Sequence, residues 1–389
     1  MPAQRWDVFC KVVDNYGDAG VCWRLARQLA AEHPFDVTLW IDAPERLVHI
    51  APGVDPKRAD QTSGRVRIRA WPSLFDDFSL PDVVVEAFGC GLPAAYIDAM
   101  ATSTRPPLWF NLEYLSAESW IEAAHGLPSP QPRLPLTRHF WFPGFTAATG
   151  GLLREAGLIE RRDAFRRDPA GTGQVATLLG IERPRQALVI SLFCYPNAAL
   201  SSLLDTWADG DEDVLLIVPE GVGTAAFDSW LAGAVPHAGQ EVRRGRLTVE
   251  DVPFVSQDDY DRVLWSCDVN FVRGEDSFVR AQWAARPFVW HIYPQDEGAH
   301  WVKLSAFLAR YTEGLDRLHA GAFASMWDAW NRGADPDSAE TVKPSLGNAW
   351  AEFVARREAL TEHAKTWSDT LATRRDLAAE LADFVDNVL

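Results

Sequence analysis

The chain alternates between short apolar segments that are typical of strands and longer amphipathic segments that are typical of helices. This strand–helix order occurs twice, first within residues 6–114 and again within residues 187–293. Continuous β-branched runs such as DVVVEAF (82–88) indicate strands that are buried on both faces, as in parallel sheets covered by helices. The sequence therefore predicts an α/β fold with two doubly wound, Rossmann-like domains facing a cleft.

The two series are predicted to join near residue 180. Residues 126–150 are rich in Pro and Gly and are predicted to be loop, whereas AGTG (170–173) and ERPRQ (182–186) are predicted to form a linker. The predicted division is 1–180 for the N-terminal domain, 181–360 for the C-terminal domain, and 361–389 for a helical tail that packs back on the N-terminal domain.

Charge limits the partners of this chain. It has 54 acidic and 37 basic residues among 389, a net charge of −17. Nucleic-acid binding normally requires a basic face, so no direct nucleic-acid partner is expected, although a local basic patch is compatible with the total. Residues 181–389 carry 33 acidic and 19 basic side chains, so an anionic ligand in that half needs a local cation.

No membrane, disulfide or metal function is expected from the sequence. No apolar run approaches the ~18 residues of a membrane helix, and the N-terminus lacks a signal-peptide pattern, which predicts a cytoplasmic protein. The five cysteines include no C-x-x-C pair, and the nine histidines include no H-E-x-x-H. The cysteines are therefore predicted to be small buried residues.

Two loops at the predicted carboxyl edges carry groups suited to chemistry. Asp14-Asn15-Tyr16-Gly17-Asp18 lies between the first strand and the first helix, where Asp18 either caps the helix or acts as a general base. Arg273-Gly274-Glu275-Asp276-Ser277 lies between a strand and a helix in the second series. One interpretation is that the acidic residues of this loop cap the helix. The other is that the helix N-terminus and Arg273 bind a phosphate.

Aromatic residues follow two other strands of the second series. Phe193 and Tyr195 follow one strand, and Phe254 with Gln257 follows another. One interpretation is that these aromatic residues belong to the hydrophobic core. The other is that Phe254 stacks on a base while Gln257 hydrogen-bonds the edge of that base. The acidic run 209–213 contains D-x-D but precedes a strand, so it is predicted to be a solvated turn rather than a metal–nucleotide motif.

Four segments together resemble the EarP family of protein-arginine rhamnosyltransferases that modify elongation factor P. The resemblance covers essentially the whole chain in order, and its segments are DNYGDAGVCWRLARQLA, SLFCYPN (191–197), PFVSQDDYD (253–261) and VRGEDSFVRAQWAARPFVWHIYPQDEGAH (272–300). It implies a glycosyltransferase type B fold, with the acceptor side and base in the N-terminal domain and the donor in the C-terminal domain. It also implies an inverting transfer of one rhamnose from dTDP-β-L-rhamnose to one arginine of elongation factor P, without a cofactor or metal. The modified factor would relieve ribosomes stalled on polyproline.

The same resemblance implies roles for individual residues. Asp18 matches the proposed general base, and Asp14 and Glu275 match two further catalytic carboxylates. The donor-binding residues implied or added at strand ends are Asn15, Tyr16, Gly17, Asp18, Phe193, Tyr195, Phe254, Val255, Ser256, Gln257, Arg273, Gly274, Glu275, Asp276, Ser277 and Tyr293. Two other interpretations stay open at this point. One is a different type B glycosyltransferase or a nucleotide-sugar epimerase with a small acceptor, and the other is a non-catalytic protein that binds a translation factor.

Overall fold

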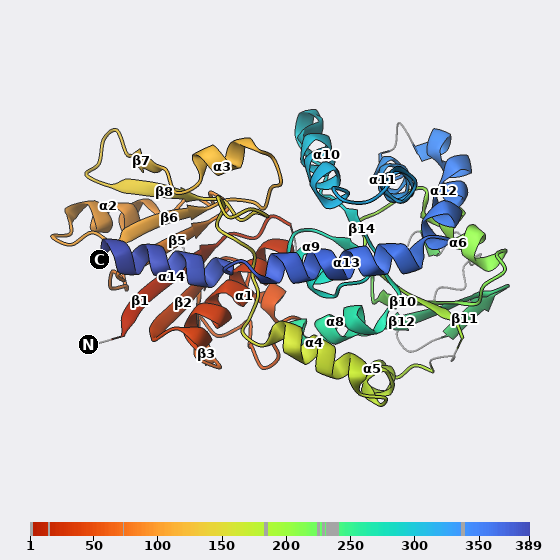
Figure 1. Cartoon of the computed structure of the whole chain (residues 1–389). Coiled ribbons are helices and arrows are strands. Elements are labelled where there is room, and N and C mark those ends of the chain that lie inside the picture. Colours follow the sequence, from red (N-terminus) through yellow and green to blue (C-terminus); the bar gives the residue numbers. More distant parts are fainter. Residues whose placement is uncertain are drawn as a thin grey trace. The chain divides into compact units, whose positions relative to one another are not determined.

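The computed structural model describes residues 3–14, 16–72, 74–182, 186–223, 226–227, 230, 241–335 and 339–389 (Figure 1). The chain forms two compact units. Unit 1 comprises Met1–Leu158 and Thr373–Leu389, and unit 2 comprises Ile159–Ala372.

Unit 1 is built on an eight-stranded sheet with the order β3-β4-β2-β1-β5-β6-β8-β7. The outermost strands β3 and β7 pair antiparallel, and the other six strands are parallel. The strands are β1 (Gln4–Cys10), β2 (Phe35–Ile41), β3 (Asp60–Ser63), β4 (Val66–Ala70), β5 (Val83–Ala87), β6 (Leu108–Leu112), β7 (Pro128–Pro130) and β8 (Thr137–Trp141). The helical elements are α1 (Gly17–Glu32), η1 (Pro44–Leu47), α2 (Ala94–Thr102), α3 (Trp120–Ala124) and α14 (Leu377–Val388).

Unit 2 is built on a six-stranded sheet with the order β11-β12-β10-β9-β13-β14, in which β11 alone pairs antiparallel. The strands are β9 (Leu188–Leu192), β10 (Val214–Pro219), β11 (Glu241–Arg244), β12 (Leu247–Val252), β13 (Val269–Arg273) and β14 (Phe288–His291). The helical elements are α4 (Leu158–Arg167), α5 (Gly171–Leu179), α6 (Leu200–Ala208), α8 (Gln257–Ser266), α9 (Asp276–Trp283), η2 (Asp296–Gly298), α10 (Ala299–Tyr311), α11 (Arg317–Arg332), α12 (Ala339–Val354) and α13 (Arg357–Ala372).

The division between the units differs from the predicted boundary near residue 180. Phe165 of α4 and Val175 and Leu179 of α5 pack into a core cluster with strands β9, β10 and β12, so both helices belong to unit 2. The segment AGTG (170–173) was predicted to be linker, but α5 already begins at Gly171. These two helices bury apolar side chains that a linker would leave in water.

The C-terminal helix α14 packs in unit 1. Leu377, Leu381 and Val385 share one core cluster with Val8 of β1 and Leu25 of α1. Figure 1 shows α14 beside α1, and both helices therefore cover the same face of the sheet. Unit 1 thus needs a segment that follows all of unit 2 in the sequence.

One loop prediction was wrong within residues 126–150. Strand β8 pairs in parallel with β6, placing Phe140 opposite Asn111 and Trp141 opposite Leu112. The surrounding prolines and glycines favoured a loop prediction, although residues 137–141 form a strand. Trp141 is the one residue of this strand that is buried. Partial burial at the end of a sheet gives a weaker apolar pattern than the central strands have.

Within the described residues, every helix is too short or too polar to cross a membrane.

Candidate active site

The loop between β1 and α1 is organised around the carboxylate of Asp18. Asp18 lies in the first turn of α1 and is only 3% exposed. Its Oδ2 accepts the backbone N–H groups of Val13, at 2.7 Å, and Asp14, at 2.8 Å. The side chain therefore holds the loop before the helix and does not cap the first turn of α1, as one interpretation of the sequence had it. Burial raises the pKa of the Asp18 carboxyl, and the two backbone N–H groups oppose this rise.

Glycine at position 17 leaves room for the Asp14 carboxylate beside it. A Cβ on Gly17 would lie 2.6 Å from Oδ2 of Asp14, which is closer than van der Waals contact allows. The Gly17 N–H also donates to the Asp14 carbonyl at 2.6 Å, which closes the turn. Tyr16 is the N-cap residue of α1, and its ring lies edge-on to His49 with 6.0 Å between centroids. Asn15 lies outside the described residues.

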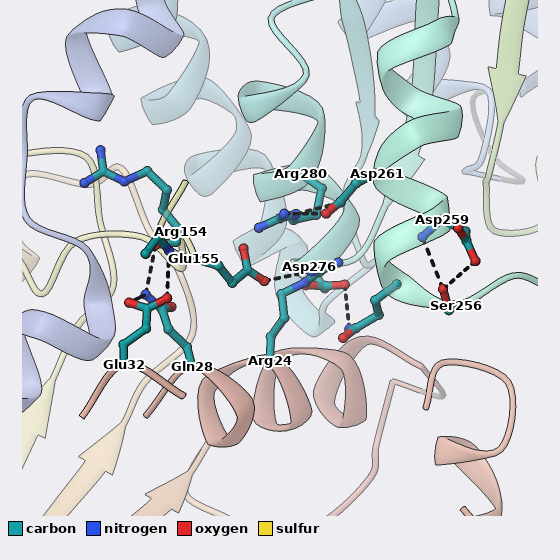
Figure 2. Close-up of polar contacts among 12 residues, drawn as sticks. Arg24, Gln28, Glu32, Arg154, Glu155, Ser256, Asp259, Asp261, Asp276 and Arg280 are labelled. Carbon is teal, nitrogen blue, oxygen red and sulfur yellow. Dashed lines mark hydrogen bonds and ion pairs between the residues drawn. The ribbon is translucent and has the colours of Figure 1, made fainter. Parts of the chain in front are cut away.

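Helix α1 is anchored by polar residues that the sequence analysis did not select (Figure 2). Nη1 of Arg24, which is 1% exposed, donates to Oε1 of Glu155 at 2.9 Å. Nε2 of Gln28 donates to the Arg154 carbonyl at 2.8 Å and to Oδ1 of Asp376, the N-cap of α14, at 2.9 Å. These contacts fix the helix that carries Asp18. The available signal was a pair of polar residues, four apart, on the buried side of this helix.

In unit 2, the turn after β13 places the RGEDS residues at the start of α9. Gly274 adopts a φ of 61°, which L side chains rarely adopt, and its carbonyl accepts the Trp290 Nε1–H at 2.8 Å. Oγ of Ser277 accepts the Arg273 backbone N–H at 3.2 Å and donates to the Arg273 carbonyl. Glu275 is the N-cap residue, and its side chain makes no capping hydrogen bond. The Glu275 side chain therefore does not cap α9, contrary to the capping interpretation.

Helices α8 and α9 are joined so that their N-termini lie together. Nε2 of Gln257 donates to Oδ2 of Asp276 at 3.1 Å. Further along, Arg280 and Asp261 form a buried two-bond ion pair, with 2.8 Å between Nε and Oδ1 (Figure 2). A buried bidentate pair fixes both partners in orientation as well as distance. Arg280 and Asp261 are positioning residues that were not predicted from the sequence. The available signal was an arginine within the largely apolar segment FVRAQWAA.

Aromatic side chains surround Arg273 in the same unit. The guanidinium carbon of Arg273 lies 4.5 Å from the ring centre of Phe193 and 4.6 Å from that of Tyr195. Phe193 contacts Phe254 edge-on at 6.3 Å, and Tyr195 contacts Tyr293 edge-on at 5.4 Å. The structure thus brings together five of the predicted donor-site residues. A cation held over aromatic faces keeps its charge and a fixed direction.

Two predicted donor-site residues have clear structural roles. The side chain of Val255 packs against the core cluster that also contains Val252 and Val263. Ser256 is the N-cap of α8, where its Oγ accepts the Asp259 backbone N–H at 3.2 Å.

Two buried titratable side chains adjoin this cluster and were not predicted. His291 is 1% exposed, and burial together with the charge of Arg273 lowers its pKa to about 3, so the ring is neutral near pH 7. Its ring stands edge-on to Tyr195 at 5.2 Å. Tyr260 contacts Phe193 edge-on at 6.1 Å, and burial raises the pKa of its hydroxyl. Arg273 is therefore the group beside these rings that carries positive charge.

The described residues contain no group of three or more His, Cys, Asp or Glu side chains that could hold a metal ion. In the acidic run 209–213, Asp213 precedes β10 and lies 3.2 Å from Arg246, while Glu212 lies 2.8 Å from Arg357.

All five cysteines are free, and all except Cys90 are buried.

Comparison with known proteins gives consistent matches over almost the whole chain. A protein-arginine rhamnosyltransferase of Pseudomonas putida is 49% identical over 384 residues, covering 99% of each chain. A protein of the same name from Neisseria meningitidis is 33% identical, covering 97% of this chain and 96% of the relative. These relatives identify the chain as a glycosyltransferase, specifically a protein-arginine rhamnosyltransferase.

Solved structures agree on the fold. A structure described as the basis for EarP-mediated arginine glycosylation of translation elongation factor EF-P is 38% identical, with a TM-score of 0.70 and 99% of each chain covered. MurG of Acinetobacter baumannii, at 12% identity and a TM-score of 0.50, shares the fold alone. The predicted glycosyltransferase type B fold is confirmed by these matches. The model of the family described as "Elongation-Factor P (EF-P) rhamnosyltransferase EarP" matches residues 6–386, and the chain belongs to that family.

Proposed function

We propose that this enzyme transfers a single rhamnose from dTDP-β-L-rhamnose to one arginine of elongation factor P, with inversion at the anomeric carbon. The proposal extends to the use of the modified factor, which would relieve ribosomes stalled at polyproline. The observation that carries it is Arg273, held over Phe193 and Tyr195 beside the N-terminus of α9. A fixed cation next to aromatic rings and exposed helix N–H groups suits a diphosphate joined to a base.

We assign donor binding to unit 2. Arg273 and the N-terminus of α9 would stabilise the negative charge that grows on the leaving dTDP, so this assignment requires no metal. Phe254 would stack on thymine, and Gln257 would hydrogen-bond the edge of the base. Gln257 is the first residue of α8, and Phe254 lies in the loop that precedes this helix. The Gln257–Asp276 contact and the Arg280–Asp261 pair join α8 to α9.

We assign proton transfer to Asp18 in unit 1. A guanidinium is a weak nucleophile because it stays protonated, with a pKa above ~12. In the proposed step, a guanidinium nitrogen forms a bond to the anomeric carbon while the bond from that carbon to the dTDP oxygen breaks. The nitrogen's proton passes to Asp18, and Asp14 and Glu275 align the guanidinium. The raised pKa of the Asp18 carboxyl makes it a better proton acceptor than an ordinary aspartate.

The test combines the purified chain with elongation factor P and dTDP-β-L-rhamnose, and measures the intact mass of the factor. We expect a gain of one deoxyhexose, which disappears when the acceptor arginine is changed to lysine. A mass gain on the lysine variant would show that a different residue is modified. No gain on either factor would contradict the assigned donor or acceptor.

A further inference from the structure

One face of the unit 1 sheet carries a row of arginines where a helix is usually found. The connections from β2 to β3 and from β4 to β5 contain no α-helix among their described residues. Along β4, Val66 and Ile68 join the core cluster on the α1 side, whereas Arg67 is exposed and Arg69 is partly exposed. The opposite face of β4 is therefore polar and accessible. We call this surface the arginine face.

The arginine face encloses a hollow of about 360 Å³ over β1, β2 and β4. Its basic lining residues are Arg5, Arg65, Arg67 and Arg69. The pairing of the strands places Asp7 beside Thr38, and Thr38 beside Arg67, in one row across the sheet. The side chains of this row project from the same face of the sheet, so the arginines face the same hollow.

The guanidinium groups of Arg5 and Arg69 are held by neighbouring side chains. Nη1 of Arg5 donates to Oγ of Ser79 at 3.0 Å, and the guanidinium carbon of Arg69 lies 4.3 Å from the ring centre of Trp40. Within the described part of the chain, no ion pair joins Arg5 or Arg65 to a carboxylate. These two cations are therefore available to a ligand, and the Arg5 side chain is already held in place.

The acidic residues near the hollow offset part of this charge. Asp36 also lines the hollow and stands opposite Arg5 in the β1–β2 register, and Oδ2 of Asp77 lies 3.7 Å from Nη2 of Arg69. Oδ2 of Asp7 already accepts the Trp40 Nε1–H at 3.0 Å and the Tyr96 hydroxyl at 2.7 Å, and the residue is 7% exposed. Asp60 is shared, since it accepts from Arg67 Nε at 2.9 Å and lies 3.5 Å from Arg69. In the lining of the hollow, four guanidinium groups therefore face two carboxylates.

The charge of this face contrasts with the rest of the molecule. Residues 57–69 contain five basic side chains and one acidic one, in a chain whose net charge is −17. An acidic partner is repelled by most of this surface and attracted here, so the arginine face would orient it. Guanidinium groups also match carboxylates geometrically, because their paired N–H groups can bind both oxygens.

We propose that the arginine face binds an acidic segment of the protein acceptor, at a distance from the arginine that is modified. This inference rests on the proposed function. Arginine side chains occur on nearly all proteins, so the choice of one protein must come from contacts outside the reacting groups. From residue 5 to residue 10, β1 spans about 17 Å at ~3.3 Å per residue. An acceptor domain of ~100 residues has a radius of gyration of about 13 Å, so it can reach both the arginine face and the Asp18 loop.

The test reverses two charges in the hollow with the double variant Arg65→Glu/Arg67→Glu. The matched control is Arg243→Glu/Arg246→Glu in unit 2, which changes the charge equally at exposed arginines that also lie beside an aspartate. We expect the KM for elongation factor P to rise about tenfold or more in the test variant and to change less than about twofold in the control. The kcat at saturating acceptor and the KM for the donor should stay within about twofold in both, because neither site is touched.

Binding of unmodified elongation factor P, measured by calorimetry without donor, separates this inference from the proposed function. Weaker binding to the test variant but not to the control supports the arginine face, even if the donor assignment fails. Equal binding to both variants and the wild type overturns it, even if rhamnose transfer is observed. Raising the salt from about 50 to about 300 mM should weaken binding to the wild type more than to the test variant. If the double variant melts early, Arg65→Gln alone, at an exposed position, replaces it.

Discussion

Replacing Asp18 with asparagine separates the charge of this residue from its structural contacts. Asn is nearly isosteric with Asp, and its side-chain oxygen can accept the same N–H groups of Val13 and Asp14 that Oδ2 accepts at 2.7 and 2.8 Å. The loop should therefore keep its conformation while it loses one negative charge. The structure then makes opposite predictions for stability and for activity.

Stability should not fall, and near pH 7.5 it should equal or exceed that of the wild type. Because the pKa of Asp18 is raised in the folded state, ionising this residue costs folding free energy. That cost is absent below the unfolded pKa, near 3.8, and grows as the pH rises through the folded pKa. Asn avoids the cost. Each pKa unit corresponds to about 1.4 kcal/mol, and ~1 kcal/mol shifts the melting temperature by about 2–4 °C in a domain of this size.

Activity should fall about 10²- to 10⁴-fold, the usual contribution of a general base. The assay is single-turnover rhamnose transfer followed by intact mass, with melting temperatures recorded at about pH 5 and about pH 8 and donor affinity measured by calorimetry. The matched control is Asp42→Asn, because Asp42 also accepts a loop N–H group, that of Val12 at 2.9 Å. The control should keep its activity within a few-fold.

Two results would refute this reasoning. If Asp18→Asn transfers rhamnose within a few-fold of the wild type, the base lies elsewhere, and Asp14 or Glu275 is the next residue to test. If the variant melts well below the wild type at both pH values, Asp18 acts mainly as a structural acceptor for the loop. Asp18→Ala calibrates that outcome, since it leaves two N–H groups unpaired at about 1–3 kcal/mol each.

Three further predictions address the rest of the site. Phe254→Ala should weaken dTDP binding in calorimetry by about five- to 150-fold, because stacking on a base contributes ~1–3 kcal/mol, and an unchanged affinity would contradict the stacking role. Gly17→Ala should displace the Asp14 carboxylate, which lies 2.6 Å from the new Cβ, and lower kcat at least about tenfold. Gly173→Ala, whose new Cβ has no neighbour within 4 Å, should leave kcat unchanged. Turnover should persist in excess EDTA, and a loss that Mg²⁺ restores would show that the diphosphate needs a metal.

The sequence predicted the central strands well because burial on both faces leaves a continuous apolar run. DVVVEAF contains β5, all of whose residues are buried. Strand β8 was missed because it lies near the end of the sheet and keeps several residues partly exposed. Helix α5 was missed because Gly171 and Gly173 are typical of turns, although Val175 and Leu179 then supply its buried face.

The loops of the candidate site were predictable, but their supports were not. Asp18 comes after β1 and Arg273 is the last residue of β13, so both lie at the carboxyl edges of parallel sheets and their location follows from the strand order. Their supports depend on pairs that are far apart in the sequence. Arg24 binds Glu155, 131 residues away, and Arg280 binds Asp261, 19 residues away. A single sequence carries no direct sign of which distant side chains meet.

The distribution of charge favours a different binding surface for each of the two proposed substrates. The net charge of −17 attracts a cationic guanidinium and repels anions over most of the surface. Against that background, the cation at Arg273 and the arginine face of unit 1 are local exceptions, and each suits a different anionic group. The diphosphate also needs aromatic neighbours for its base, which Arg273 has in Phe193 and Tyr195. An acidic protein segment needs several guanidinium groups on an open surface instead. Under both proposals, the two anionic groups would bind in different units because each unit offers its arginines in a different setting.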